Sequence, residues 1–196
     1  RRAQGKIKAL EEVVEQAPLT ATVGIGHTRW ATHGAPSERN AHPHQSGRVT
    51  VVHNGIIENF AELRADLQAK GRTFTSDTDT EVIAHLIDEE LKAGHSPLGA
   101  LQATLDQIKG AYALGVLIEG EEKMILGARH GSPLVIGYGE GEMFLRTVDR
   151  SHERLDEQHV SELRAAAGQG VRAYPQRLAV RAALGKRLRQ RALSIA

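Results

Sequence analysis

The sequence predicts an α+β fold, because strand-like segments come first, helical segments follow, and strand-like segments then return. Apolar, β-branched runs lie at residues 20–25 and 49–52, and four more lie between residues 111 and 145. Helical spacing of apolar residues occupies most of the interval from 58 to 108. No βαβ unit repeats along the chain, which argues against a regularly alternating parallel sheet.

The composition is that of a soluble globular domain with a sizeable core. The 196 residues are 40% hydrophobic and 25% charged. No apolar run reaches the roughly 20 residues of a membrane span, and none follows the N-terminus as in a signal peptide. There is no cysteine, which excludes disulfides, thiolate zinc sites and a cysteine nucleophile within these residues. We expect a cytoplasmic protein without a membrane partner. Because no Met begins the sequence, we also expect it to start within a longer protein.

The charge is uneven along the chain. Residues 146–196 contain 11 Lys and Arg against 5 Asp and Glu, whereas residues 1–145 contain 14 against 19. We predict helices at 153–167 and 176–193, with thin apolar faces. A basic tail suggests either a nucleic-acid arm or a segment of different origin from the rest. Since no aromatic residues interleave with the arginines, we expect no nucleic-acid partner.

Four helices are predicted from apolar spacing, at 6–16, 58–70, 80–92 and 98–108. Pro18 follows the first of them, and Gly71 ends the second. Residues 27–47 have no periodicity and are predicted to be a loop. The last four strands, at 111–118, 123–128, 134–138 and 143–145, are separated by short turns, which is typical of an antiparallel meander.

Polar side chains cluster directly after two apolar runs. In residues 26–34, Arg29 at a predicted strand end is suited to hold a substrate carboxylate, although an isolated arginine more often forms a surface salt bridge. The only tryptophan, Trp30, is costly to expose and suits a closing wall. The residues around the second run, 51–59, contain the dipeptide Asn54-Gly55.

Two short motifs each have two interpretations. Asn54-Gly55 is the strongest local turn signal, yet an Asn amide and a Gly N–H can also form an oxyanion hole. The triplet Asp77-Thr78-Asp79 can bind an ammonium group or a metal, or Asp79 can cap the helix that follows. Neither motif alone distinguishes between its two interpretations.

Five of the ten histidines lie between His27 and His53, which raises the question of a metal site. Their spacings match no zinc template, and no cysteine is present. We therefore expect no metal site.

Taken together, the motifs resemble those of one enzyme family. HTRWATHG at 27–34, NAHPH at 40–44, VVHNGIIEN at 51–59 and SDTDTE at 76–81 occur in this order, followed by KGAYAL at 109–114 and RHGSPLVIG at 129–137. The sequence from 1 to 145 resembles the glutaminase domain of the glutamine–fructose-6-phosphate aminotransferases (glucosamine-6-phosphate synthases). Other class II glutamine amidotransferases share the Arg and Asn-Gly elements, but they do not usually have a Trp in the first motif.

The resemblance implies a fold, an activity and a set of site residues. The fold is an incomplete N-terminal-nucleophile hydrolase αββα sandwich of mostly antiparallel sheets. Arg29 binds the glutamine α-carboxylate, Asp79 binds its α-ammonium, and Asn54 and Gly55 form the oxyanion hole. Trp30, Thr32 and His33 belong to the loop that covers the substrate. The implied partners are L-glutamine, a sugar-isomerase domain of the same full-length protein, and further copies in a homo-oligomer. The resemblance implies neither a metal nor an organic cofactor.

Two departures from the family pattern modify this expectation. The family's nucleophile is an N-terminal cysteine. The chain has none, so we expect it to bind glutamine poorly and to hydrolyse none. From Arg146 onward the family pattern ends, which suggests a frame-shifted tail over 146–196. The alternatives are a catalytically inactive glutamine-binding or regulatory module, and the glutaminase domain of another class II amidotransferase.

Overall fold

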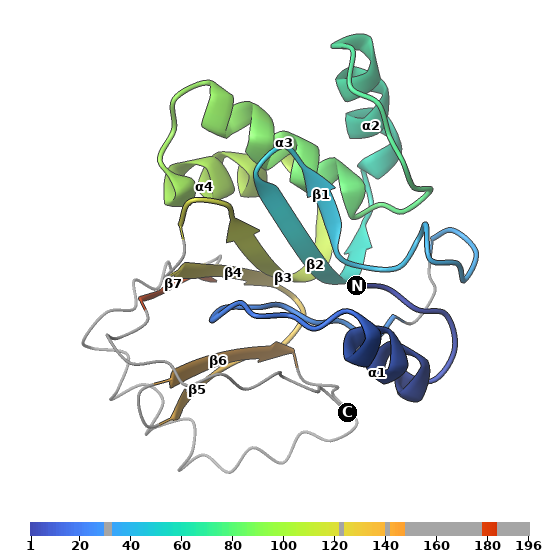
Figure 1. Cartoon of the computed structure of the whole chain (residues 1–196). Helices are drawn as coiled ribbons and strands as arrows, with labels where there is room; N and C mark the ends of the chain where they lie inside the picture. Colours follow the sequence, from blue (N-terminus) through green and yellow to red (C-terminus); the bar gives the residue numbers. More distant parts are fainter. Residues whose placement is uncertain (30–32, 122–123, 140–141, 148–177, 184–196) are drawn as a thin grey trace.

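The computed structural model describes residues 1–29, 33–121, 124–139, 142–147 and 178–183. Three helices, between residues 60 and 107, lie on one side of a five-stranded sheet, and the helix at 7–16 and a two-stranded hairpin lie on the other side (Figure 1). The predicted α+β class is confirmed. Among the described residues, none of the helices combines the length and apolar character needed to cross a membrane.

The larger sheet is antiparallel throughout, in the order β1-β2-β3-β4-β7. Its strands are β1 (His44–Ser46), β2 (Val49–Ile57), β3 (Gly110–Ile118), β4 (Met124–His130) and β7 (Leu178–Ala183). The central strand β3 reads GAYALGVLI and is buried over most of its length, so both of its faces are apolar. In β2, Val49, Val51, His53 and Ile57 point to the core, because alternate side chains of a strand share one face.

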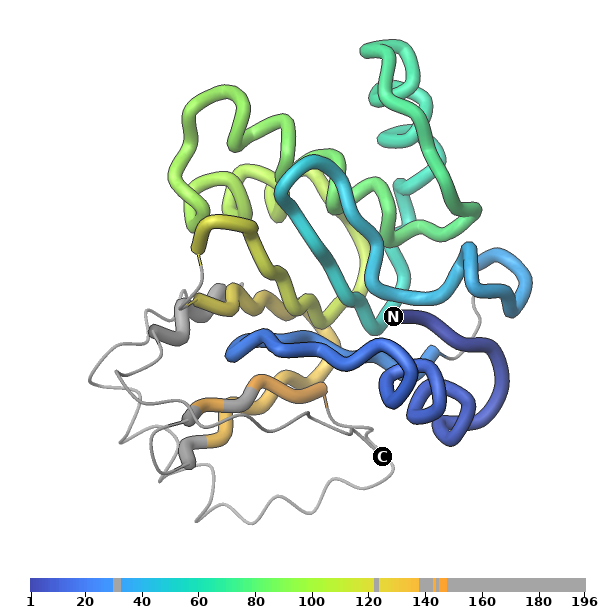
Figure 2. Tube along the Cα trace, viewed as in Figure 1, coloured from blue at the N-terminus to red at the C-terminus, as the bar shows by residue number. Residues whose placement is uncertain are grey.

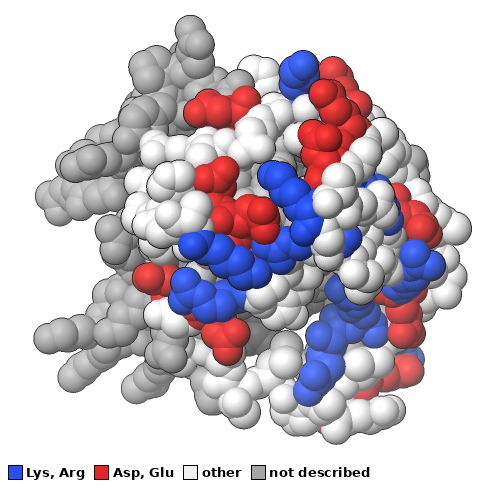
Figure 3. Space-filling view, turned by 90° about the horizontal axis from the view of Figure 1, so that it is seen from above, with Lys and Arg blue, Asp and Glu red and all other residues white. Residues whose placement is uncertain are grey.

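Three helices cover the core-facing side of this sheet: α2 (Phe60–Ala69), α3 (Glu81–Lys92) and α4 (Pro97–Gln107). The middle helix α3 contacts α2, α4, β1 and β2, and buries Ile83 and Ile87 completely. Ser96 caps α4 by accepting a hydrogen bond from the Gly99 N–H at 3.2 Å. Basic and acidic side chains are interspersed over this helical face (Figure 3).

The helix predicted at 6–16 is α1 (Ile7–Gln16), and it has no fully buried residue. After it, residues 18–29 extend out and back between the large sheet and the hairpin of β5 (Leu134–Gly139) and β6 (Glu142–Thr147) (Figure 2). Gly24, Ile25 and Gly26 line a hollow of about 570 Å³ together with residues of β2, β3 and the hairpin. This segment therefore lies between the two sheets and contributes to the wall of the hollow that separates them.

The predicted strand at 20–25 is wrong. These residues have no ladder partner among the described parts of the chain, and only Val23 and Ile25 are partly buried. An apolar, β-branched composition favours a strand only where a neighbouring strand accepts its hydrogen bonds. Conversely, the short strand β1 (His44–Ser46) lies within the predicted loop at 27–47 and pairs with the start of β2.

The meander prediction is right for the strands and wrong for their order. All four predicted strands exist, but β4 pairs with β7 rather than with β5, and β5–β6 forms a separate sheet. Strand β7 also replaces part of the helix predicted at 176–193, because Leu178–Ala183 adds to the free edge of β4. The helix predicted at 153–167 lies outside the described residues.

Candidate functional site

A cavity of about 390 Å³ lies where β2 ends, in front of the N-terminus of α3. Its wall brings together five predicted site residues from separate parts of the sequence, namely Arg29, His33, Asn54, Gly55 and Asp79. The other two predicted residues, Trp30 and Thr32, lie outside the described residues. His27, His42, His53 and Thr80 complete much of the wall.

Asn54 and Gly55 lie inside β2, opposite Ala113 and Tyr112 of β3. The hairpin-turn interpretation of this dipeptide is therefore wrong. Gly55 has φ = +127°, and a Cβ at this position would lie 2.1 Å from the carbonyl oxygen of Ala111. Only glycine tolerates both the positive φ and this approach, so the Gly serves the close pairing of two strands.

The Asn54 side chain is held at both ends of its carboxamide. Its Oδ1 lies 2.6 Å from His27 Nε2, and its Nδ2 donates to Thr147 Oγ1 at 2.6 Å. The two partners come from the 18–29 segment and from β6. Asn54 therefore connects three parts of the fold.

The Asp79 carboxylate is buried, with only 4% of the residue exposed. Its Oδ2 accepts a hydrogen bond from the Ile57 N–H at 2.9 Å and lies 3.9 Å from both His33 Nδ1 and His53 Nδ1. The predicted capping role is wrong, because the residue at the N-cap of α3 is Thr80 and no side chain caps this end. Asp79 instead joins the start of α3 to the end of β2.

Arg29 holds the loop that follows it. Its guanidinium donates to three successive main-chain oxygens, those of His33, of Gly34 at 2.9 Å and of Ala35 at 3.3 Å. The surface salt bridge considered for this residue is thus replaced by main-chain contacts. A guanidinium has five N–H groups, and three of them have these acceptors among the described residues, which leaves two for a ligand.

Neutral imidazoles form one wall of the cavity. The rings of His27 and His42 lie 4.0 Å apart, and those of His42 and His44 4.9 Å apart. Burial lowers the pKa of His27 and His42, and it lowers the pKa of His44 to about 4. Burial likewise lowers the pKa of His53 to about 4, although the Asp79 charge opposes this. These rings therefore offer hydrogen bonds without charge near pH 7.

The hydroxyl of Thr80 bridges two of these rings. Its Oγ1 lies 2.9 Å from His42 Nε2 and 3.0 Å from His53 Nδ1. Within the described ranges, no three His, Cys, Asp or Glu side chains are arranged to hold a metal ion. The histidine cluster packs around hydroxyl groups.

Comparison with known families decides what kind of domain this is. Residues 27–147 match the family described as "Glutamine amidotransferase domain". The chain belongs to this family. The match covers every residue of the 390 Å³ cavity.

Three curated relatives of this amidotransferase domain share one name. The chain is 72% identical over 145 residues to a glutamine–fructose-6-phosphate aminotransferase (isomerizing) of Caulobacter vibrioides, 60% to that of Brucella suis and 57% to that of Gluconobacter oxydans. Each alignment covers 74% of this chain and 24% of the relative. The chain thus spans about a quarter of the length of the curated relatives it matches.

Solved structures support the fold class of the amidotransferase domain. The chain is similar to the Bacillus subtilis glutamine phosphoribosylpyrophosphate amidotransferase complexed with ADP and GMP, with a TM-score of 0.50 and 30% identity over 61% of this chain and 26% of that one. It is also similar to an allosteric regulatory enzyme of purine biosynthesis, with a TM-score of 0.51 and 31% identity over 62% and 26% of the two chains. The N-terminal-nucleophile fold class is confirmed.

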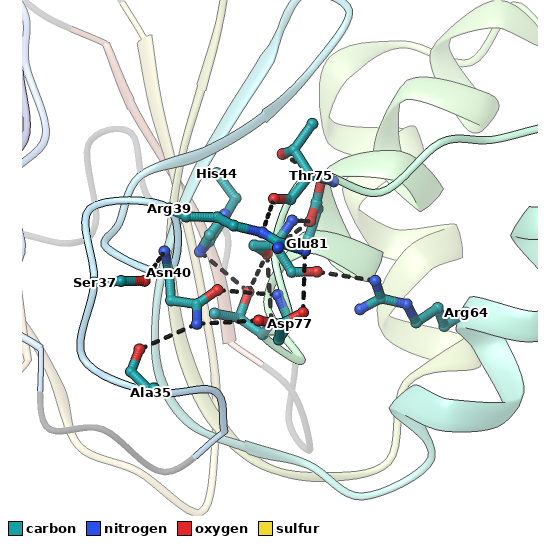
Figure 4. Close-up of polar contacts among 11 residues, drawn as sticks. Ala35, Ser37, Arg39, Asn40, His44, Arg64, Thr75, Asp77 and Glu81 are labelled. Atoms are coloured by element: carbon teal, nitrogen blue, oxygen red, sulfur yellow. Dashed lines mark hydrogen bonds and ion pairs between the residues drawn. The ribbon is translucent and has the colours of Figure 1, made fainter.

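A buried glutamate anchors the loop that carries Asp79 in this amidotransferase domain (Figure 4). Glu81 Oε1 accepts from the N–H and hydroxyl of Thr75, and Oε2 accepts from the N–H and hydroxyl of Ser76, at 2.6 to 2.9 Å. Burial raises the pKa of Glu81, but contact with His85 and these hydrogen bonds together lower it well below its usual range. The Glu81 carboxylate thus accepts the hydrogen bonds that these four donors would otherwise make to water.

Asn40 connects this loop to the one after Arg29 (Figure 4). Its Oδ1 accepts from the Asp77 N–H at 3.0 Å, and its Nδ2 donates to the Ala35 carbonyl at 3.1 Å. His44 Nε2 lies 3.1 Å from the Thr78 hydroxyl. The loop after Arg29 and the loop that carries Asp79 are therefore held together beside one cavity.

Sequence reasoning gave several residues that shape the site no role in it, and it considered His27 only as one of five clustered histidines. His27, Asn40 and Glu81 lie inside the motifs at 27–34, 40–44 and 76–81, where their position was a usable signal. Thr147 had no such signal, because it meets Asn54 from 93 residues away.

Proposed function

We propose that the chain binds L-glutamine in the 390 Å³ cavity. Arg29 takes the α-carboxylate, Asp79 takes the α-ammonium, and the Asn54 amide with the Gly55 N–H takes the side-chain carbonyl oxygen. The observation that supports this most is the convergence of these four residues on one cavity in a chain of the glutamine amidotransferase family.

The chemistry of the cavity suits a free amino acid. A cationic side chain and a buried carboxylate line the same space, which complements a zwitterion. The wall also includes three neutral imidazoles and threonine hydroxyls. Its volume lies near the lower end of the roughly 300 to 1,000 Å³ of small-molecule sites. Glutamine has a small number of heavy atoms and fits that size class.

In the full-length protein, we propose that this domain supplies ammonia to a glutamine–fructose-6-phosphate aminotransferase. The name shared by relatives up to 72% identical supports this assignment, while the similarity to the purine enzymes stands at 30 and 31%. Asn54 and Gly55 then stabilise the oxyanion that develops as the side-chain amide is attacked. Trp30, Thr32 and His33 cover the substrate. A sugar-isomerase domain and further copies of the protein are the proposed partners.

The 196 residues contain no cysteine, so we propose that this chain binds glutamine without hydrolysing it. A glutamine-binding or regulatory module is the second candidate function, and the same fact favours it. Release of glutamate from glutamine by the purified chain would contradict both the proposal of binding without hydrolysis and the inactive-module candidate. Glutamine binding without glutamate release agrees with both.

We also propose a boundary near residue 145. The alignments with relatives span 145 residues, and the family match ends at 147. Since β7 pairs with β4, this boundary in sequence does not separate two bodies in space. The DNA around codon 146 tests the frame-shift origin, because a shifted frame then continues the family pattern.

Isothermal titration calorimetry with L-glutamine tests the binding proposal. We expect a dissociation constant in the millimolar range, lost in Arg29→Ala and in Asp79→Ala. Arg48→Ala and Asp66→Ala are the controls, because both residues are exposed and neither lines the cavity. Absence of binding to the unaltered, folded chain contradicts the proposal, as does equal loss in the control variants.

A further inference from the structure

The carboxamide of Asn54 is the one proposed ligand-binding group whose direction depends on other side chains. A carboxamide has an acceptor oxygen and two N–H donors, and its terminal torsion is broad and roughly two-fold. Turned one way, it presents an N–H to a ligand. Turned the other way, it presents an oxygen, which repels the carbonyl oxygen of a substrate.

The contacts of Asn54 favour one of these directions. His27 is neutral because burial lowers its pKa, so the ring carries a single hydrogen. Asn54 Oδ1 can only accept, and it lies 2.6 Å from His27 Nε2. With Oδ1 facing the ring in this way, the hydrogen resides on Nε2.

The opposite end of the amide has a matching partner. Asn54 Nδ2 donates one hydrogen to Thr147 Oγ1 at 2.6 Å, and the second remains for the cavity. His27 and Asn54 both line the 390 Å³ cavity, while Thr147 lines the adjoining 570 Å³ hollow that also includes them. The amide thus lies between the two spaces, with a partner on each side.

We propose that His27 is a positioning residue that, with Thr147, turns the Asn54 carboxamide so that an Nδ2–H faces the side-chain carbonyl of bound glutamine. This inference rests on the proposed glutamine site. His27 does not contact the reacting atoms in it. It acts through the orientation of Asn54.

Nuclear magnetic resonance tests the orientation without any ligand. Long-range ¹H–¹⁵N spectra report which ring nitrogen of His27 is protonated, and we expect Nε2–H. We expect the two side-chain amide protons of Asn54 to have distinct shifts in the unaltered chain, and these shifts to move toward exposed-amide values in His27→Leu. In His27→Gln, whose amide N–H can donate to Oδ1, they stay close to the original. An Nδ1–H tautomer, or Asn54 shifts unchanged in His27→Leu, overturns the proposal.

Calorimetry then tests the consequence for binding. Losing one positioning hydrogen bond weakens glutamine binding about three- to tenfold in His27→Leu. In the Asn54→Ala background the same substitution has no further effect, because there is no amide left to turn. An equal loss in both backgrounds shows that His27 acts otherwise and overturns the proposal. His95→Ala, at an exposed histidine outside the cavity, is the matched control.

Variants of Thr147 provide an independent test that leaves the histidine cluster unaltered. Thr147→Val removes the acceptor at nearly constant shape, and Thr147→Ser retains it. We expect weaker binding only in the Val variant, and equal binding by both variants contradicts the role of this hydroxyl. If the unaltered chain shows the Nε2–H tautomer but binds no glutamine, the proposed function fails while the orientation of Asn54 stands.

Discussion

Gly55 illustrates how far a single residue can be constrained by its neighbours. It lies within a strand, where glycine ordinarily weakens the structure. At this position, however, φ = +127° and the Ala111 carbonyl oxygen occupies the space of a Cβ. The requirement comes from the pairing of β2 with β3 and not from a turn.

Replacing this glycine tests that statement at the scale of one residue. Gly55→Ala should lower the free energy of unfolding by roughly 2–4 kcal/mol, since backbone strain and overpacking add. Guanidinium unfolding followed by circular dichroism measures the change.

Gly71→Ala is the matched control for Gly55→Ala. Gly71 also has a positive φ, of +86°, but a Cβ there meets nothing within 4 Å. Gly71→Ala should therefore lower the free energy of unfolding by only about 1 kcal/mol, the cost of backbone strain alone. Equal losses in the two variants would mean that contact with Ala111 contributes nothing.

The residues of the site were predictable to different degrees. Arg29, His33, Asn54, Gly55 and Asp79 lie in motifs that resemble a known family, and the structure brings all five to one cavity. Their partners depend on tertiary contacts. The His27–Asn54 pair joins residues 27 apart, and Thr147 joins Asn54 from 93 residues away, distances at which sequence patterns indicate nothing.

At the scale of elements, the four helices predicted before residue 110 were predicted well, whereas the strands and the helix at 176–193 were predicted less well. Helical spacing is a local property, so α2, α3 and α4 lie within a few residues of the predicted ranges. A strand depends on a partner that the local sequence does not specify. Residues 20–25 have strand-like composition without a partner, and the turn signal at Asn54-Gly55 is overridden by pairing with β3.

The loop before α3 is an element whose shape depends on one carboxylate. Glu81→Gln removes the negative charge that accepts four hydrogen bonds from Thr75 and Ser76. At pH 7 the loss in unfolding free energy should be about 1–3 kcal/mol. Glu62→Gln, at an exposed glutamate of α2, is the control and should change little.

The difference in unfolding free energy between the unaltered chain and Glu81→Gln should depend on pH in a defined direction. The pKa of Glu81 is lowered in the folded state, so its contribution is complete above the ordinary value of 4.5 and is lost as the pH falls below it toward the folded pKa. The gap between the unaltered chain and Glu81→Gln therefore narrows below pH 4.5. A gap that widens on acidification contradicts the assignment.

At the scale of the whole molecule, the cavity exists only because distant segments meet. The loop after Arg29, the end of β2 and the residues before α3 each contribute one side of it. Hydrogen bonds of Asn40 and of His44 join the loops across the sequence. The proposed glutamine site is thus a property of the folded chain.

The buried histidines make the stability of the whole chain sensitive to acid. Burial lowers the pKa of His44 and His53 to about 4 from the ordinary 6.5. Between these values the unfolded chain binds protons that the folded chain does not, so stability is complete above pH 6.5 and falls as the pH drops toward 4. Denaturant unfolding at several pH values measures this loss. Histidine resonances that titrate near pH 6.5 for both residues would contradict it.

The pairing of β2 with β3 has a consequence for how such a site could evolve or be redesigned. A slip of one residue would bring His53 opposite Ala113 and would turn every side chain of β2 to the other face. Core residues such as Val51 and the proposed ligand-binding Asn54 therefore share one register, and neither can be moved without the other. Changes of substrate preference are most accessible in the loop after Arg29, whose main-chain contacts can be rebuilt while the sheet stays in place.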